Sequence, residues 1–347
     1  MKKFFVLIFL TFFYLPAFAQ TISDNPRIQK IDQILTGLEK EGLNGVILIR
    51  SHNELLLHKA YGVADREKSK KVGLETGFCI GSLVKSMTAA GVLRLEEMGK
   101  LSTADTLARF FPSVPEDKKN ITIAQIMSHT AGMDDMFGSD YEIVTRDWLQ
   151  DKALGAKLIG EPGAKRVYSN SGYSVLAIII EKASGKTYEK FIRDEVLKPA
   201  GVKRIGYIHA GWKNKDLAVG YYEDKRWGSP LDKKWAKDGP SWNLRGNGGM
   251  LSTVEETAAW YEALLEGKVL KPESLKKFLA NSSGTSRTLG ERVILLAGGN
   301  DVFNSIQFST IDSDFHMTFF TSNAKFEAEK IVAVRDEAFA LVKELRK

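Results

Sequence analysis

The residues best suited to nucleophilic chemistry are a serine and a lysine three positions apart, Ser82 and Lys85. The segment that follows predicts a helix that continues to Met98 and stops at Gly99, which would place both side chains on one helix face. There the lysine amine can reach the serine hydroxyl, and the positive helix end favours a developing alkoxide. The pair therefore indicates covalent acyl transfer.

The same spacing also occurs at Ser274–Lys277 and Ser322–Lys325, where it is typical of capping or loop serines beside solvated lysines. A second element strengthens the first pair, because Tyr168 and Asn170 form the only Tyr-x-Asn among ten tyrosines. A tyrosine can shuttle a proton when an ammonium stabilises its phenolate, and an asparagine can accept from that lysine while donating to a substrate carbonyl. The alternative is a packed aromatic residue followed by a helix cap at Asn170 or Ser171.

The sequence lacks the motifs of several other kinds of catalytic or binding site. It contains no Gly-x-Ser-x-Gly elbow, no His-Glu-x-x-His, no phosphate-binding loop of the Walker type and no cysteine pair. The single cysteine, Cys79, is expected to be a buried, inert thiol. Neither a metal nor a cofactor is implied, because the histidines lack metal-ligand spacing and each is expected to be structural: His52, His58, His129, His209 and His316.

The serine segment is the first of four blocks that follow one another along the chain. They are Phe78–Thr88, Ile121–Met133, Pro162–Tyr173 and Gly248–Thr253. Together they resemble the serine β-lactamase and penicillin-binding-protein superfamily, and specifically its class C β-lactamase-like branch with D-aminopeptidases and family VIII esterases. The resemblance covers most of the chain after residue 20, and His129 lies in one of its blocks without a catalytic role.

The resemblance implies a role for each matching residue. Ser82 would be the acylated nucleophile, Lys85 and Tyr168 the proton-transfer pair, and Asn170 an amide that orients the substrate. The oxyanion hole requires only backbone N–H groups, which here would be those of Ser82 and Gly299.

One block departs from the family pattern. Where the family carries Lys or His, then Thr or Ser, then Gly, the segment Leu296–Gly299 reads Leu-Ala-Gly-Gly. The missing pair helps to bind a substrate carboxylate and supports the proton network in the family, so we expect small esters or peptide-like amides to be preferred over β-lactams. Arg292 or Arg245 would be the alternative source of charge. Gly298 is expected to let the backbone approach a substrate closely.

The positioning elements predicted around these residues form an α+β sandwich. Apolar alternation predicts strands at both ends of the chain, and the middle is mostly helical. We expect one antiparallel sheet built from both termini and flanked by helices. The chain would be a single β-lactamase-like domain over 20–347, with a sheet part at about 20–80 plus 285–347 and a helical part at about 81–284. The strands are predicted at Gly45–Ile49, Leu55–Tyr61, Val293–Leu296, Phe303–Ser309 and Phe315–Thr321.

The N-terminal segment is expected to be a signal peptide over residues 1–19. Two lysines precede the apolar run Phe4–Leu15, and Ala17–Ala19 supplies a small-x-small cleavage site. A membrane anchor is the alternative, but a spanning helix needs about 20 apolar residues and Pro16 interrupts the run. Cleavage after Ala19 would direct the protein to the periplasm or the medium.

Charge gives little sign of a polyanionic partner. The formal net charge is +6 at pH 7, and basic runs such as Arg66–Lys71 alternate with acids and lack interleaved aromatic residues. They are therefore interpreted as solvated faces, not as a nucleic-acid footprint. The expected partner is a small-molecule or peptide substrate, with no stable membrane anchor and no prediction of oligomeric state.

The functional hypothesis is a secreted serine hydrolase that acts through a Ser82 acyl-enzyme on an ester or amide. The alternative is a protein of the same fold that binds cell-wall peptides or a related ligand without turnover, which the altered segment Leu296–Gly299 motivates. Residues able to transfer protons have little reason to occur together in a pure binder.

Overall fold

The computed structural model describes residues 20–52, 54–235, 239–281, 285–288, 291–311, 315–323 and 328–346. The predicted signal segment 1–19 lies outside them. The elements are β1 (Thr21–Ile22), α1 (Pro26–Lys40), β2 (Gly45–Ser51), β3 (Glu54–Tyr61), β4 (Val63–Asp65), β5 (Lys70–Lys71), β6 (Phe78–Cys79), η1 (Gly81–Leu83), α2 (Val84–Glu97), α3 (Leu107–Phe110), α4 (Ile123–Met127), α5 (Arg146–Gly155), α6 (Asn170–Ser184), α7 (Tyr188–Ile192), η2 (Arg193–Leu197), η3 (Asn214–Asp216), β7 (Gly220–Tyr222), β8 (Lys225–Gly228), η4 (Pro230–Asp232), β9 (Leu251–Ser252), α8 (Val254–Leu265), α9 (Pro272–Asn281), β10 (Thr285–Thr288), β11 (Glu291–Asn300), β12 (Phe303–Thr310), β13 (Phe315–Thr321) and α10 (Ala328–Leu345).

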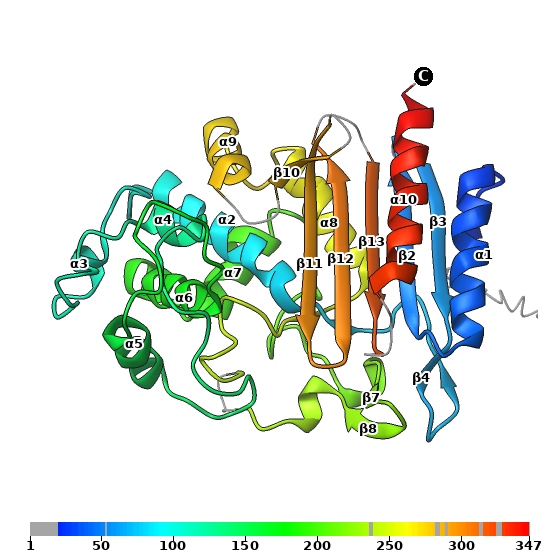
Figure 1. Cartoon of the computed structure of the whole chain (residues 1–347), viewed down its shortest axis with the longest axis horizontal. Coiled ribbons are helices and arrows are strands. Elements are labelled where there is room, and N and C mark those ends of the chain that lie inside the picture. Colours follow the sequence, from blue (N-terminus) through cyan, green and yellow to red (C-terminus); the bar gives the residue numbers. More distant parts are fainter. Residues whose placement is uncertain are drawn as a thin grey trace, which may run out of the picture.

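The main sheet combines strands from both ends of the chain. Its order is β1-β3-β2-β13-β12-β11-β10, and every neighbouring pair is antiparallel. The two halves meet where β2 pairs with β13, with Ile47 opposite Phe319 and Ile49 opposite Met317. In Figure 1 the blue N-terminal strands lie beside the orange C-terminal ones. The predicted α+β fold with a sheet built from both termini is confirmed.

Helices cover both faces of this sheet. On β2, Ile47 and Ile49 belong to the apolar core shared with α1 and α10, whereas Val46 and Leu48 belong to the larger core on the opposite face. This division follows from strand geometry, since successive side chains point to opposite faces. The terminal helix α1 begins where predicted, because Asn25 Oδ1 accepts the N–H groups of the first turn and a proline follows.

Helix α2 runs through the interior of the helical region. It packs against α6, α7 and α9, and a Cβ at Gly91 would lie only 2.6 Å from the side chain of Ile192. Helix α8 lies within the range predicted for the helical part, yet it packs on β2 and β13 of the sheet. There Arg50 of β2 donates to both carboxylate oxygens of Glu262 at 2.8 Å. The sheet therefore gains its second helical cover from the middle of the chain (Figure 1).

Strand β11 is longer than the predicted Val293–Leu296 and includes the glycine pair Gly298 and Gly299. Its pairing with β10 ends at Ile294, so beyond that residue β12 is its only strand partner in the described chain. The short helix η1 packs against this open part of β11. Because η1 contains Ser82, the free strand edge and the candidate nucleophile are neighbours.

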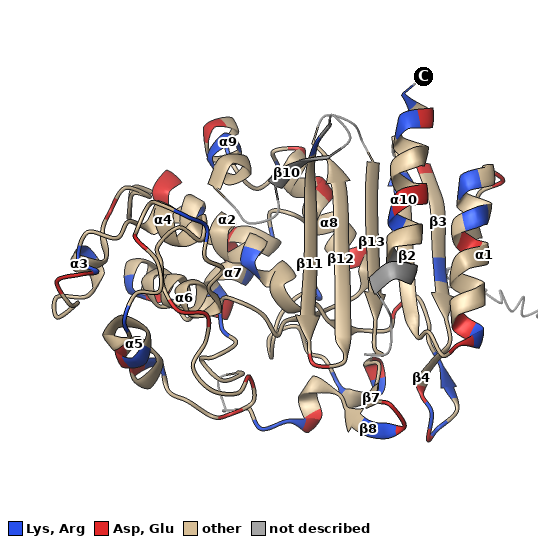
Figure 2. Cartoon of the chain, in the orientation of Figure 1, with Lys and Arg blue, Asp and Glu red and all other residues tan. Residues whose placement is uncertain are grey.

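Charged side chains of both signs share the described surface. Figure 2 shows Lys and Arg interspersed with Asp and Glu along α1 and α10. Between these helices, Arg27 Nη1 lies 3.1 Å from Glu337 Oε2, and Arg27 Nε lies 2.7 Å from Glu344 Oε2. In the described part of the chain, no helix is both long enough and apolar enough to cross a bilayer.

Candidate active site

The candidate nucleophile is held by two close backbone contacts. Strand β6 pairs with β9, and the N–H of Ile80 donates to the carbonyl of Met250 at 2.9 Å. Gly81 then adopts a φ of +47°, and a Cβ there would lie 2.7 Å from Gly299 N. Only glycine fits this turn without displacing β11. Ser82 follows it in η1, immediately before α2.

Ser82, Lys85 and Tyr168 converge as the sequence predicted. Lys85 Nζ donates to Ser82 Oγ at 3.1 Å, and Ser82 Oγ lies 2.7 Å from the Tyr168 hydroxyl. Lys85 Nζ also donates to Asn170 Oδ1 at 2.6 Å and to the carbonyl oxygen of Asn247 at 2.7 Å. The predicted residues therefore form one hydrogen-bonded group, and sequence reasoning missed Asn247.

The Ser-x-x-Lys spacing at Ser274–Lys277 does not create a second site of this kind in the described chain. On α9, Lys277 Nζ pairs with Glu96 at 2.8 Å. The segment Ser322–Lys325 lies partly outside the described residues.

The Lys85 amine is deeply buried, since only 1% of the residue is exposed. Burial lowers its pKa to about 7, although the charges of Asp135 and Asp140 act in the opposite direction. Its three hydrogen-bond acceptors are neutral oxygens, so none of them is a counter-ion for an ammonium. A substantial fraction of Lys85 is thus a neutral amine near pH 7, and can accept a proton.

His129 contacts Tyr168 through its ring and through hydrogen bonds to the neighbouring backbone. The rings stack with centroids 4.6 Å apart, while the backbone on either side of Tyr168 is tied to the same histidine. The N–H of Val167 donates to the His129 carbonyl at 2.7 Å, and the N–H of Ser169 donates to its Nδ1 at 3.1 Å. Because burial lowers the pKa of His129 to about 3, its ring stays neutral and Nδ1 remains an acceptor. The expected structural role of His129 thus becomes that of a positioning residue.

Asn170 is free for the site because another residue caps α6. Ser169 Oγ accepts the N–H of Gly172 at 2.9 Å, so the alternative of a cap at Asn170 or Ser171 is wrong. Asp135 Oδ1 accepts both the backbone N–H and the Nδ2 group of Asn170 at 2.9 Å. This contact directs Asn170 Oδ1 to Lys85 and leaves one N–H of the amide available for a substrate.

The predicted oxyanion groups lie where two backbones touch. A Cβ at Gly298 would lie 2.9 Å from Ser82 N and 2.4 Å from Ile80 O, so β11 and the nucleophile turn are in direct contact. The side-chain position of Gly298 is therefore filled by protein, and a substrate can meet only its backbone. Gly299 is exposed, and a Cβ there would meet only Asn304 Oδ1 at 3.9 Å, so its side-chain side is open.

The structure gives no sign that the arginines suggested by the sequence replace the missing charge. Leu296 is buried in the core and Ala297 is exposed. Arg292 lies six residues before Gly298, about 20 Å away along an extended strand. Arg245 is 5% exposed, and its Nε donates to a backbone carbonyl inside the fold.

Arg166 is a cation that sequence reasoning missed. Its guanidinium carbon lies 5.8 Å from the centroid of the Tyr168 ring, and its charge acts to lower the pKa of that phenol, although burial raises it overall. The side chain is exposed and makes no hydrogen bond or ion pair with the described residues. The alternation Arg166, Tyr168 on an extended segment was the available signal.

A loop from Asp135 to Tyr141 reaches from Asn170 to the end of β11. Asn300, directly after Gly299, donates from Nδ2 to Asp140 at 2.5 Å and accepts from the Tyr141 hydroxyl at 2.5 Å. Burial, with the nearby charge of Asp301, raises the pKa of Asp140 to about 6. This polar contact fixes the strand end that carries the predicted oxyanion donor.

A family model and related sequences both place this chain near the β-lactamases and penicillin-binding proteins. A family model described as Beta-lactamase matches residues 30–298. The chain is 30% identical over 264 residues to PbpX of Bacillus subtilis (strain 168), whose name places it among the penicillin-binding proteins, with 76% of this chain and 65% of that protein covered. It is 34% identical over 172 residues to penicillin-binding protein 4* of the same organism, covering 47% of this chain and 38% of the relative. The chain thus spans less than two thirds of either relative.

Solved structures share the fold at low sequence identity. The D-amino acid amidase of Ochrobactrum anthropi SV3 superimposes with a TM-score of 0.76 at 21% identity, covering 92% of this chain and 99% of the amidase. A class C beta lactamase of Rhodobacter sphaeroides gives 0.74 at 16% identity, covering 90% and 99%. Since the family model spans well over half of the sequence, this chain belongs to the Beta-lactamase family, within the β-lactamase and penicillin-binding-protein superfamily of serine hydrolases.

Proposed function

We propose that this protein hydrolyses an ester or amide through an acyl-enzyme on Ser82. The observation that carries the proposal is the position of Ser82 Oγ, 3.1 Å from the Lys85 amine and 2.7 Å from the Tyr168 hydroxyl. A nucleophile within hydrogen-bond reach of a proton acceptor and a phenol is the arrangement that nucleophilic catalysis requires.

Acylation begins with Lys85 as the base. Its neutral amine takes the Ser82 proton while Oγ bonds to the substrate carbonyl carbon, and the resulting oxyanion accepts from the N–H groups of Ser82 and Gly299. When the C–O or C–N bond breaks, the Tyr168 hydroxyl gives its proton to the leaving group. The Lys85 ammonium then gives its proton to the Tyr168 phenolate, which restores the phenol and the neutral amine. Burial raises the pKa of Tyr168, which favours a protonated phenol as the donor at this step.

Deacylation uses the same groups in the second half of the cycle. Water attacks the acyl carbon and gives its proton to Lys85, and Ser82 Oγ recovers a proton as the ester bond breaks. The products are a carboxylic acid and free enzyme. No further reactant is needed.

The segment Leu296–Gly299 bears on the substrate class. With a buried leucine and an alanine in place of a cation and a hydroxyl, small esters and peptide-like amides are favoured over β-lactams. The same change motivates the alternative function, a protein that holds a cell-wall peptide or related ligand without turnover. The intact hydrogen-bonded group around Lys85 favours the hydrolase.

The first prediction separates the two functions. Wild type should hydrolyse p-nitrophenyl butyrate and be labelled covalently by a fluorophosphonate, whereas Ser82→Ala should lose the label and at least about 10³-fold in kcat. Tyr168→Phe should lose about 10²-fold to 10⁴-fold in kcat. Ser274→Ala, which removes the serine of the repeated spacing, is the matched control and should behave as wild type. Hydrolysis that survives Ser82→Ala would eliminate this nucleophile, and an unlabelled wild type would favour the binder.

The second prediction concerns pH. Lys85 must be neutral to accept the Ser82 proton, so kcat/KM for a neutral ester should rise with pH, with a midpoint near 7, and then reach a plateau. A profile measured between pH 5 and pH 9, within the range where the fold is stable by circular dichroism, tests this. A rate that still rises at pH 9 without a plateau, as expected for a phenol that titrates at about pH 10, would instead make Tyr168 the base.

The third prediction concerns Arg166, whose unpaired guanidinium can bind a substrate carboxylate. Arg166→Gln should lower kcat/KM about tenfold for a peptide with a free C-terminal carboxylate, and much less for p-nitrophenyl butyrate. Lys165→Gln removes the same charge from the exposed neighbouring residue and serves as control. An equal loss on both substrates would show that Arg166 acts on Tyr168 and not on a carboxylate.

The fourth prediction concerns location. We propose that the protein is exported to the periplasm or the medium, which the apolar run Phe4–Leu15 and the site Ala17–Ala19 support. N-terminal sequencing of protein recovered from the periplasm or medium should begin at Gln20. Recovery of uncleaved chain in the cytoplasm alone would contradict export.

A further inference from the structure

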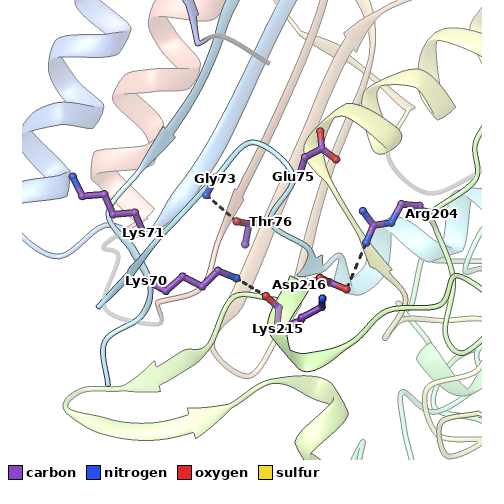
Figure 3. A pocket seen from close by; sticks show the side chains of 8 residues that line it. All are labelled: Lys70, Lys71, Gly73, Glu75, Thr76, Arg204, Lys215 and Asp216. Atoms are coloured by element: carbon purple, nitrogen blue, oxygen red, sulfur yellow. Dashed lines mark hydrogen bonds and ion pairs between the residues drawn. The ribbon is translucent and has the colours of Figure 1, made fainter. Parts of the chain in front are cut away.

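A second concave site lies outside the catalytic group, beside β5 and η3. It is a cavity of about 260 Å³, and Figure 3 shows the side chains around it. Its lining comes from separate parts of the chain and includes none of the residues assigned to catalysis. The lining residues are Lys70, Lys71, Gly73, Glu75, Thr76, Arg204, Lys215 and Asp216.

Contacts of both side chains and backbone groups hold the segments around this cavity. Lys70 Nζ donates to the carbonyl of Lys215 at 2.5 Å, and the N–H of Gly77 donates to the carbonyl of Asp216 at 2.9 Å. The guanidinium of Arg204 lies over the Trp212 ring, 4.0 Å from its centroid. The first two contacts join the segments at 70–77 and 215–216, and the third fixes Arg204 against Trp212.

Cations outnumber carboxylates around the cavity by four to two. Figure 3 shows Lys70 and Arg204 approaching from opposite sides. Arg204 reaches Asp216 only at 3.9 Å, and that carboxylate also accepts the N–H of Lys213. The ammonium groups of Lys71 and Lys215 make no hydrogen bond or ion pair with the described residues. Figure 3 shows Lys71 directed away from Lys70 and Arg204, so the charge at the cavity comes from Lys70, Arg204 and Lys215, and Asp216 only partly neutralises it.

The hydroxyl group of Thr76, which lines the cavity, adds a neutral hydrogen-bond donor. Thr76 is 5% exposed, and its Oγ accepts the N–H of Gly73 at 2.9 Å. Within the described chain the hydroxyl hydrogen of Thr76 has no acceptor, so it is free to donate into the cavity. Guanidinium, ammonium and hydroxyl donors around one cavity form the donor set that binds phosphoryl oxygens.

We propose that this cavity binds a phosphoryl group, carried by a small phosphate compound or by a phospholipid headgroup. Arg204 and Lys70 supply the charge from opposite sides, and Thr76 supplies a hydroxyl donor. Glu75 lines the same cavity without a partner in the described chain, and its carboxylate can accept from a hydroxyl group of the ligand. The basic run Arg66–Lys71, interpreted from the sequence as a solvated face, contributes two of these lysines.

The test measures phosphate binding with the whole protein. In calorimetric titration at constant ionic strength, wild type should bind inorganic phosphate and glycerol phosphate, whereas chloride at equal ionic strength should give no saturable heat. The double variant Lys70→Gln, Arg204→Gln should bind at least about tenfold more weakly. The matched control is Lys68→Gln, Lys203→Gln, which removes two neighbouring exposed charges that do not line the cavity and should bind as wild type.

A second measurement distinguishes the sources of the phosphoryl group. Sedimentation with phosphatidylglycerol vesicles that is lost in the double variant but kept in the control assigns a lipid headgroup. Binding of glycerol phosphate without vesicle binding assigns a small soluble compound. Equal phosphate affinity in wild type and the folded double variant, or no saturable binding by wild type, overturns the proposal. Ser82→Ala should bind phosphate normally, so this outcome is independent of the proposed hydrolase.

Discussion

The burial of one lysine amine constrains the whole site. A charged ammonium loses hydration when it is buried, and a carboxylate in contact with it would restore the charge. In the described chain, Lys85 Nζ instead makes its hydrogen bonds to neutral oxygens, those of Ser82, Asn170 and Asn247. Its pKa therefore lies near neutrality, and the amine can move a proton. Placing three neutral acceptors around one buried nitrogen requires the helical region to bring α2, α6 and the turn before β9 together.

The sheet supplies the second half of the site through backbone contact. The free edge of β11 meets the nucleophile turn where Gly81 and Gly298 allow the two backbones to touch. Side chains at either position would separate Ser82 from Gly299. Asn300 then ties the strand end to the loop that also holds Asn170 through Asp135. The groups that transfer protons and the groups expected to stabilise an oxyanion are thus connected by one continuous set of contacts.

Sequence reasoning succeeded where side-chain type carries the signal. The spacing of Ser82 and Lys85 and the rarity of Tyr-x-Asn located the catalytic candidates, and apolar alternation located the main strands. Asn247 could not be found in this way, because it acts through a carbonyl that every residue has. The cap of α6 was assigned to the wrong residue because Ser169, Asn170 and Ser171 all favour that position. The extension of β11 was missed because glycines weaken a strand pattern.

The proposed base is Lys85 because burial lowers its pKa, whereas burial raises the pKa of Tyr168. Leu296 belongs to the apolar core and carries no charge, so the segment Leu296–Gly299 supplies no cation that could stabilise a phenolate at Tyr168. The nearest remaining cations are Lys85, whose charge is itself suppressed by burial, and Arg166, which is exposed and therefore screened by solvent. Burial consequently dominates at Tyr168 and raises its pKa. In the proposed mechanism, the neutral amine of Lys85 therefore accepts protons and the phenol of Tyr168 donates them.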